Sequence, residues 1–191
     1  MGVPRIDTGP MTVDEFYAFT DTRPDEEKWE LIDGEPVLNA SPSGLHQRIV
    51  QNLSRALGRR AEESDAGWEV LPGLGIRISD VKRPEPDFLV LPTLTGDGLA
   101  KRDTDKALVA FEILSPSTED RDLRWKRTAY TGLASLTHYV VIAQDAVEVV
   151  VFARANGFNE HRLRSLDDVL NFENLGISVP LAEIYRNTGL R

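Results

Sequence analysis

The sequence predicts one α/β domain with a mixed central sheet flanked by helices. Residues 87–91 and 107–114 are continuous apolar runs that carry one acid each, a pattern typical of buried central strands. Residues 45–61 place apolar side chains at helical spacing and predict an amphipathic helix. The length of 191 residues suits one sizeable core, so we take residues 1–191 as a single domain.

The N-terminal region predicts a helix followed by a hairpin. Thr12 and Glu15 form a capping-box pattern ahead of aromatic residues, which indicates the start of a short helix. Residues 29–32 and 36–38 flank an Asp-Gly turn and predict two antiparallel strands. Residues 1–10 show no periodicity and are expected to be a loose leader.

The remaining predicted elements are short. Residues 121–130 predict a helix directly after the central strand, and residues 179–186 predict a small C-terminal helix. Residues 92–106 are polar and predict a long loop. Further strands are predicted at residues 68–71, 74–78, 139–142, 147–152 and 158–163.

Composition excludes several classes of protein. The chain has no cysteine, so it has no disulfide and no thiolate zinc site. No apolar run reaches the length of a membrane span and no signal pattern is present, so we expect a cytoplasmic protein without a membrane partner. The net charge of -9 argues against a protein that coats nucleic acid through a broad basic surface. It leaves room for a local site in which metal ions offset acidic ligands.

Two charged residues stand where the pattern calls for apolar ones. Glu112 interrupts the strand at residues 107–114, where a buried carboxylate is costly unless it lies at an edge, against a cation or on a metal. Lys126 falls on the same helical stripe as Leu123 and Tyr130. Because this strand and this helix are expected to pack together, the two misfits predict a functional site.

Strand pairing brings a second acid to that site. If the two central strands are antiparallel with Leu91 opposite Leu108, Asp87 lies opposite Glu112. Residues directly opposite have Cβ atoms only ~5 Å apart, so the two carboxylates repel unless a cation lies between them. Hard cations such as Mg²⁺ take oxygen ligands. With Lys126 from the next helix, this is the equipment for hydrolysing a phosphodiester with metal-activated water.

These residues resemble the PD-(D/E)XK nuclease superfamily. Pro86-Asp87, Glu112 and Lys126 match its motif, although Leu114 stands where the superfamily has lysine and Glu85 lengthens the Arg-Pro-Asp run. More closely, nearly the whole chain is similar to the Uma two family of endonuclease-like proteins, which supplies the lysine from the following helix. The segments that carry the likeness are residues 29–35, the Ser-Pro-Ser turn before His46, residues 83–87, residues 112–118, Asp122, Lys126 and Tyr130.

The resemblance implies a restriction-endonuclease-like fold and a Mg²⁺-dependent endonuclease acting on DNA, with Mn²⁺ as a substitute. It implies Asp87 and Glu112 as metal ligands and Lys126 as a catalytic lysine. Glu30 is implied as an additional acid at the site. His46 in the first turn of its helix is expected to act as a general base or substrate contact.

Each assignment has a structural alternative. Asp87 could simply be the first residue of a strand, and Glu30 could face solvent. His46 could cap its helix, and Lys126 could form a surface pair with Asp122. On the catalytic assignment, Lys126→Met should abolish activity and spare stability. For the whole chain, the alternatives are a catalytically silent nucleic-acid-binding or assembly module of the same fold and a hydrolase of small phosphoesters. The intact acid-acid-lysine set favours an enzyme, and a homodimer is left open.

Overall fold

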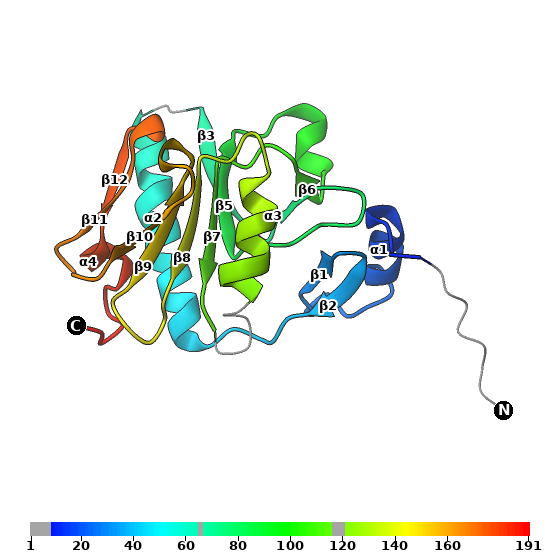
Figure 1. Ribbon diagram of the computed structural model, residues 1–191, viewed down its shortest axis with the longest axis horizontal. Coiled ribbons are helices and arrows are strands. Elements are labelled where there is room, and N and C mark those ends of the chain that lie inside the picture. Colours follow the sequence, from blue (N-terminus) through cyan, green and yellow to red (C-terminus); the bar gives the residue numbers. More distant parts are fainter. Residues whose placement is uncertain (1–8, 65–66, 116–120) are drawn as a thin grey trace.

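A six-stranded mixed sheet forms the centre of the molecule (Figure 1). The computed structural model describes residues 9–64, 67–115 and 121–191. In the sheet, β7 and β8 are parallel and the other neighbours are antiparallel, which confirms the predicted mixed sheet. In spatial order the strands are β10 (Glu160–Leu163), β9 (Val149–Ala153), β8 (His138–Ile142), β7 (Val109–Ile113), β5 (Phe88–Pro92) and β3 (Trp68–Pro72).

Helices cover both faces of the sheet. α2 (Gly44–Ser64) packs its apolar side chains against Val109, Phe111 and Ile113 of β7. On the other face, Tyr130 of α3 (Arg127–Thr131) packs with Ala110. Because side chains alternate along a strand, Glu112 shares the α3 face with Ala110. The strand therefore aims its single acid at the helix that carries Lys126.

The N-terminal helix and hairpin form as predicted. The capping box of Thr12 and Glu15 opens α1 (Val13–Thr20), and β1 (Trp29–Ile32) pairs with β2 (Glu35–Leu38). The turn needs glycine at position 34, because φ is +82° there and an added Cβ would lie 2.2 Å from a Pro10 carbon. Leu31 and Arg83 exchange backbone hydrogen bonds of 2.9 and 3.0 Å, which dock the hairpin beside the sheet.

The loop at residues 92–106 has more structure than expected. It contains a 3₁₀ turn, η1 (Gly96–Ala100), and a two-residue strand, β6 (Asp103–Thr104). β6 pairs in parallel with β4 (Gly75–Ile76), which is shorter than the strand predicted at residues 74–78. The observed strand β4 is short because its partner β6 offers only two residues to pair with.

The predicted C-terminal helix at residues 179–186 is wrong in its extent. Val179 pairs with Leu170 in a hairpin of β11 (Val169–Phe172) and β12 (Ile177–Pro180), so the helix α4 covers only Leu181–Ile184. The hairpin is closed by the 3₁₀ turn η4 (Glu173–Leu175) and a left-handed glycine. Its buried apolar side chains extend the core against α2. A further 3₁₀ turn, η3, spans Arg154–Asn156.

The helix predicted at residues 121–130 begins with an unusual turn. Residues Arg121–Lys126 (η2) are π-helical and continue into α3. π-turns inside helices are rare and often mark functional sites. The sequence offers Ser117 or Thr118 as the cap of this helix, and both positions lie outside the described residues. In the part of the chain that the structure describes, no helix is long and apolar enough to cross a membrane.

Candidate active site

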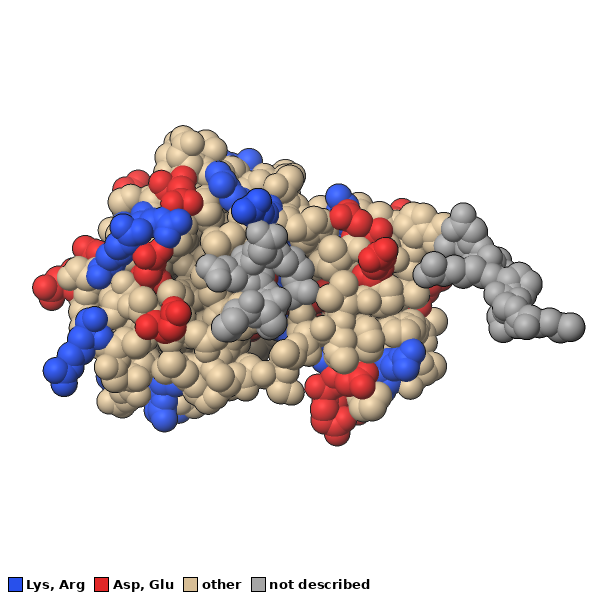
Figure 2. All heavy atoms as spheres, turned by 60° about the horizontal axis from the view of Figure 1, so that its bottom comes forward, with Lys and Arg blue, Asp and Glu red and all other residues tan. Residues whose placement is uncertain are grey.

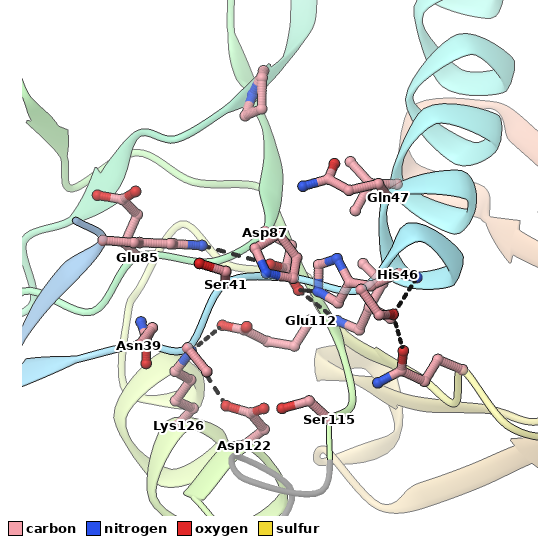
Figure 3. A pocket seen from close by; sticks show the side chains of 18 residues that line it. Asn39, Ser41, His46, Gln47, Glu85, Asp87, Glu112, Ser115, Asp122 and Lys126 are labelled. Carbon is pink, nitrogen blue, oxygen red and sulfur yellow. Dashed lines mark hydrogen bonds and ion pairs between the residues drawn. The ribbon is translucent and has the colours of Figure 1, made fainter. Parts of the chain in front are cut away.

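A pocket of about 420 Å³ opens where β5 begins and β7 ends (Figure 3). Its walls come from the start of α2, from η2 and from the segments flanking the two strands. Four acids line it, together with two lysines and one histidine. These ionisable lining residues are Glu85, Asp87, Glu112, Asp122, Lys28, Lys126 and His46. The pocket thus collects more carboxylates than cations.

The strand register matches the sequence prediction. Phe88 pairs with Phe111 in the antiparallel β5–β7 ladder, so the next position outward sets Asp87 opposite Glu112. The ladder continues there, since the Asp87 N–H donates to the Phe111 carbonyl at 3.1 Å. Asp87 and Glu112 both line the pocket. The structure therefore brings the two predicted metal ligands to the same cavity.

Lys126 lies at the centre of a buried cluster. Its Nζ is 2.8 Å from Glu112 Oε1 and 3.2 Å from Asp122 Oδ1 (Figure 3). It is also 3.0 Å from Glu30 Oε1. The exposed fractions of Lys126 and Asp122 are 2% and 1%. The alternative of a surface pair between these two residues is therefore wrong. One ammonium is shared by three carboxylates from three different elements.

Burial and crowding perturb both members of the central pair. Burial raises the pKa of the Glu112 carboxyl well above its usual range; Lys126 opposes this shift and the neighbouring acids add to it. Burial alone would lower the pKa of Lys126, but the surrounding carboxylates raise it well above its usual value. The ammonium thus stays charged, and among the described residues three carboxyl groups surround this one cation.

Two buried tyrosines donate hydrogen bonds to residues of this cluster. The Tyr130 hydroxyl donates to Glu112 Oε1 at 3.0 Å, and the Tyr139 hydroxyl donates to the Asp122 carbonyl at 2.8 Å. From the sequence, Tyr130 was part of the helical stripe and of the family likeness, and Tyr139 was part of a strand, but neither hydroxyl was given a hydrogen-bonding role. Their signal was available, because a buried tyrosine hydroxyl needs a hydrogen-bond partner.

Glu30 is buried and fully engaged, so the alternative that it faces solvent is wrong. It is 0% exposed, and its Oε1 accepts the Glu85 N–H at 2.7 Å as well as the Lys126 contact. Its Oε2 accepts Asn39 Nδ2 at 2.9 Å. Glu30 is not among the residues that line the pocket. It contacts Lys126 from behind and orients it.

Asp87 is held by three donors. His46 Nε2 lies 3.1 Å and the Ile113 N–H 2.7 Å from Asp87 Oδ2, while Lys28 Nζ lies 3.5 Å from Oδ1. Burial raises the pKa of Asp87, but the His46 contact, the charge of Lys28 and the backbone hydrogen bond together lower it to about 2. Asp87 is therefore ionised across the physiological range.

His46 reaches Asp87 from the first turn of α2. Its own N–H donates to Ser43 Oγ at 3.1 Å, so Ser43 caps this turn and the histidine side chain does not. Nδ1 of His46 is buried and has no hydrogen-bond partner among the described residues. The imidazole is thus positioned to hold Asp87 rather than to contact solvent.

Asp122 is the site residue that sequence reasoning missed. From the sequence it was named in the family likeness and as the surface partner of Lys126 at i and i+4, but it was not predicted as a site residue. A second missed contact is that between Trp125 Nε1 and Asp33 Oδ2 at 2.7 Å. It ties η2 to the turn of the hairpin that carries Glu30.

The oxygen donors of the pocket suit a hard divalent cation. Mg²⁺ in proteins is typically held by one or two carboxylates and keeps waters and substrate phosphates as its other ligands. Asp87 and Glu112 supply two such carboxylates. Within residues 9–64, 67–115 and 121–191, no group of three or more His, Cys, Asp or Glu side chains is arranged to hold a metal ion. Two carboxylates beside an open pocket with room for water and phosphate ligands are a donor set that fits Mg²⁺.

Comparison with known proteins places the chain in a family. Residues 13–181 match the Uma2 family model, described as "Putative restriction endonuclease". The chain is a member of the Uma2 family. The match covers most of the chain and includes each predicted site residue, so it supports a nuclease in general terms. No protein with a curated description matches this Uma2 chain.

A solved structure shows the same fold. It is described as a putative nuclease belonging to DUF820 from Anabaena variabilis, and it superposes on the Uma2 chain with a TM-score of 0.75. The likeness covers 92% of this chain and 98% of the other, at 16% sequence identity. The predicted α/β nuclease-type fold and the predicted family are thus both confirmed.

Proposed function

We propose that this Uma2 protein is a Mg²⁺-dependent endonuclease that hydrolyses DNA phosphodiester bonds, with Mn²⁺ as a substitute. The observation that carries the proposal is the buried cluster in which Lys126 meets Glu112 at the wall of an acidic pocket. A protein gains little stability from burying more acids than bases. Such an excess of charge is typical of a site that binds a cation.

Asp87 and Glu112 would hold the metal from the two paired strands. A bound Mg²⁺ supplies Lewis acidity, which lowers the pKa of water and offsets charge on a phosphate. Asp87 is ionised and so available as a ligand, because His46, Lys28 and the Ile113 N–H all stabilise its charged form. His46 is a positioning residue in this proposal, because Nε2 contacts Asp87 and Nδ1 is buried.

Lys126 is the proposed catalytic residue that acts on the phosphate. Glu30 and Asp122 hold its ammonium at the wall of the pocket beside Glu112. An ammonium fixed there offsets charge that develops on the scissile phosphate in the transition state, without reorganising first. Removing one such contact typically costs on the order of 10²–10³ in rate.

A nuclease assay on wild type and Glu112→Gln tests the proposal. DNA is incubated with Mg²⁺, with Mn²⁺ or with a chelator, and Glu35→Gln on the exposed face of the hairpin serves as the matched control. We expect wild type and Glu35→Gln to cleave with either metal, and neither the chelated protein nor Glu112→Gln to cleave. Folded wild type that binds DNA and cleaves none with either metal would establish the silent module instead.

A further inference from the structure

A second pocket of about 360 Å³ adjoins the catalytic pocket. Lys28 and Glu85 line both cavities, so the two share a wall. Four cations and two acids line the second pocket, so basic side chains outnumber acidic ones there, whereas acidic side chains outnumber basic ones in the catalytic pocket. These charged lining residues are Lys28, Arg83, Lys101, Arg102, Glu27 and Glu85. We call it the basic pocket.

The basic pocket is a local feature of an acidic protein. The chain has a net charge of -9, and on the face shown in Figure 2 basic and acidic side chains alternate in small groups. A broad electrostatic footprint for nucleic acid is therefore not what this face offers. A small cavity with a basic excess is the kind of place where individual phosphates are bound.

Arg83 is built into the wall of the basic pocket. It is only 5% exposed, and it donates to Glu85 Oε2 at 2.6 Å and to the Arg102 carbonyl at 2.7 Å. Its Nε is buried without a hydrogen-bond partner in the described part of the chain. An added Cβ on Gly75 would lie 2.1 Å from that Nε, so only glycine leaves room for the guanidinium.

Two lysines bring further charge to the basic pocket. Lys101 is exposed and forms no ion pair among the described residues. The side chain of Lys28 is 34% exposed, and its 3.5 Å contact with Asp87 is at the limit of a hydrogen bond. Arg102 lies 4.4 Å from the centre of the Tyr17 ring, which fixes its guanidinium at the rim.

The short segment of residues 83–87 connects the two pockets. Arg83 lines the basic pocket, Glu85 lines both, and Asp87 lines the catalytic pocket. The intervening residues are Pro84 and Pro86, whose rings fix φ and stiffen the segment. Four residues of extended chain span at most ~14 Å. A strand whose scissile phosphate lies at Asp87 can therefore present a phosphate one or two nucleotides away to Arg83.

We propose that the basic pocket binds a phosphate of the substrate strand, one or two nucleotides from the scissile phosphate. The proposal rests on the proposed function and adds a substrate-binding site to it. Phosphate contacts of this kind fix the register of a strand and carry no base information. Hydrogen bonds also link the basic pocket to the cluster around Lys126. The Glu85 carboxylate accepts from Arg83, and the Glu85 backbone N–H donates to Glu30.

The test measures DNA binding without metal. In a Glu112→Gln background with chelator, Lys101→Ala removes one pocket cation and Lys106→Ala removes a cation from the same loop outside the pocket. Both lysines are exposed, so neither change should affect folding. We expect Lys101→Ala to weaken binding of a short labelled oligonucleotide about fivefold and to reduce the slope of log K against log salt by about 1. Lys106→Ala should change neither quantity.

Neutral phosphates supply the second arm. A methylphosphonate at one position near the cleavage site should weaken binding to the Lys106→Ala protein, and it should weaken binding to Lys101→Ala by a smaller factor because one of the four pocket cations is already missing. Equal affinity and salt slope for both proteins, or no binding by the Glu112→Gln parent, would overturn the inference. Because no cleavage is measured, the result is separate from the nuclease assay. If wild type cleaves DNA while Lys101→Ala binds it normally, the phosphate-binding role of the basic pocket is refuted and the proposed nuclease activity is not.

Discussion

At the scale of single residues, the described part of the cluster around Lys126 contains three acids and one base. Glu30, Glu112 and Asp122 all lie within 3.2 Å of one ammonium, and all are at most 3% exposed. Buried ion pairs barely repay their desolvation even when they are balanced. An unbalanced cluster is therefore a cost to stability in the metal-free protein. That cost motivates the first prediction.

Glu112→Gln should stabilise the metal-free protein. Because the folded-state pKa of Glu112 is raised, folding favours its protonated form, and wild-type stability falls as the pH rises above about 4.5. Glutamine keeps the shape and an acceptor for Lys126 and Tyr130 without the charge. We expect its melting temperature at neutral pH to exceed that of wild type by about 2–4 °C, the effect of about 1 kcal/mol in a chain of this length.

The measurement is thermal unfolding of both proteins in chelator across a pH series. The difference between them should grow as the pH rises and vanish toward acid. A Glu112→Gln protein that melts well below wild type at neutral pH would show that Lys126 depends on this carboxylate for its charge balance.

Removing the charge of Lys126 should abolish cleavage and also lower stability. The sequence alone predicted that Lys126→Met spares stability, but the ammonium serves three buried carboxylates. Breaking a buried pair from one side costs about 3–5 kcal/mol. We expect cleavage to fall by on the order of 10²–10³ and the melting temperature to fall clearly.

A double variant separates these two effects. Lys126→Met with Glu30→Gln also removes the charge of one of the three acids that contact the lysine, so its melting temperature should recover part of the loss. Its cleavage rate should stay as low as that of Lys126→Met. Recovery of cleavage along with stability would make Lys126 a structural residue.

At the scale of elements, the site depends on how the hairpin meets η2. The hairpin brings Glu30 and the helix brings Asp122 and Lys126, while the Trp125–Asp33 hydrogen bond joins the two elements outside the pocket. The pKa of Asp33 is lowered mainly by this hydrogen bond. The loop at residues 92–106 contributes no residue to the catalytic pocket, because it joins the ends of β5 and β7 that lie away from Asp87 and Glu112.

Trp125→Phe should weaken the positioning of Lys126 without removing metal binding. Loss of the indole N–H removes one hydrogen bond, worth about 1 kcal/mol, so the melting temperature should fall by about 2–4 °C. Because Lys126 follows Trp125 directly, we expect cleavage to fall about tenfold with metal affinity retained. Lys82→Ala is the control, since it removes the other contact of Asp33 and leaves the indole bond. Equal cleavage by Trp125→Phe and wild type would show that the contact does not position Lys126.

At the scale of the whole molecule, patterns along the chain predicted the centre and missed contacts between distant segments. The β5–β7 register followed from two lone acids in apolar strands, and Lys126 followed from a charged residue on an apolar stripe. The contact of Glu30 with Lys126 depends on the bridge between Leu31 and Arg83, which has no local signature. The C-terminal hairpin was missed because its strands are only four residues long.

The central claim is that Asp87 and Glu112 together hold a divalent cation. Titration calorimetry with Mn²⁺ on wild type, Asp87→Ala, Glu112→Gln and Glu35→Gln tests it most directly. We predict one binding site in wild type and in Glu35→Gln, and loss of that site in both Asp87→Ala and Glu112→Gln, with all four proteins folded at the temperature of the titration. Mn²⁺ binding by Asp87→Ala with the affinity of wild type would contradict the claim.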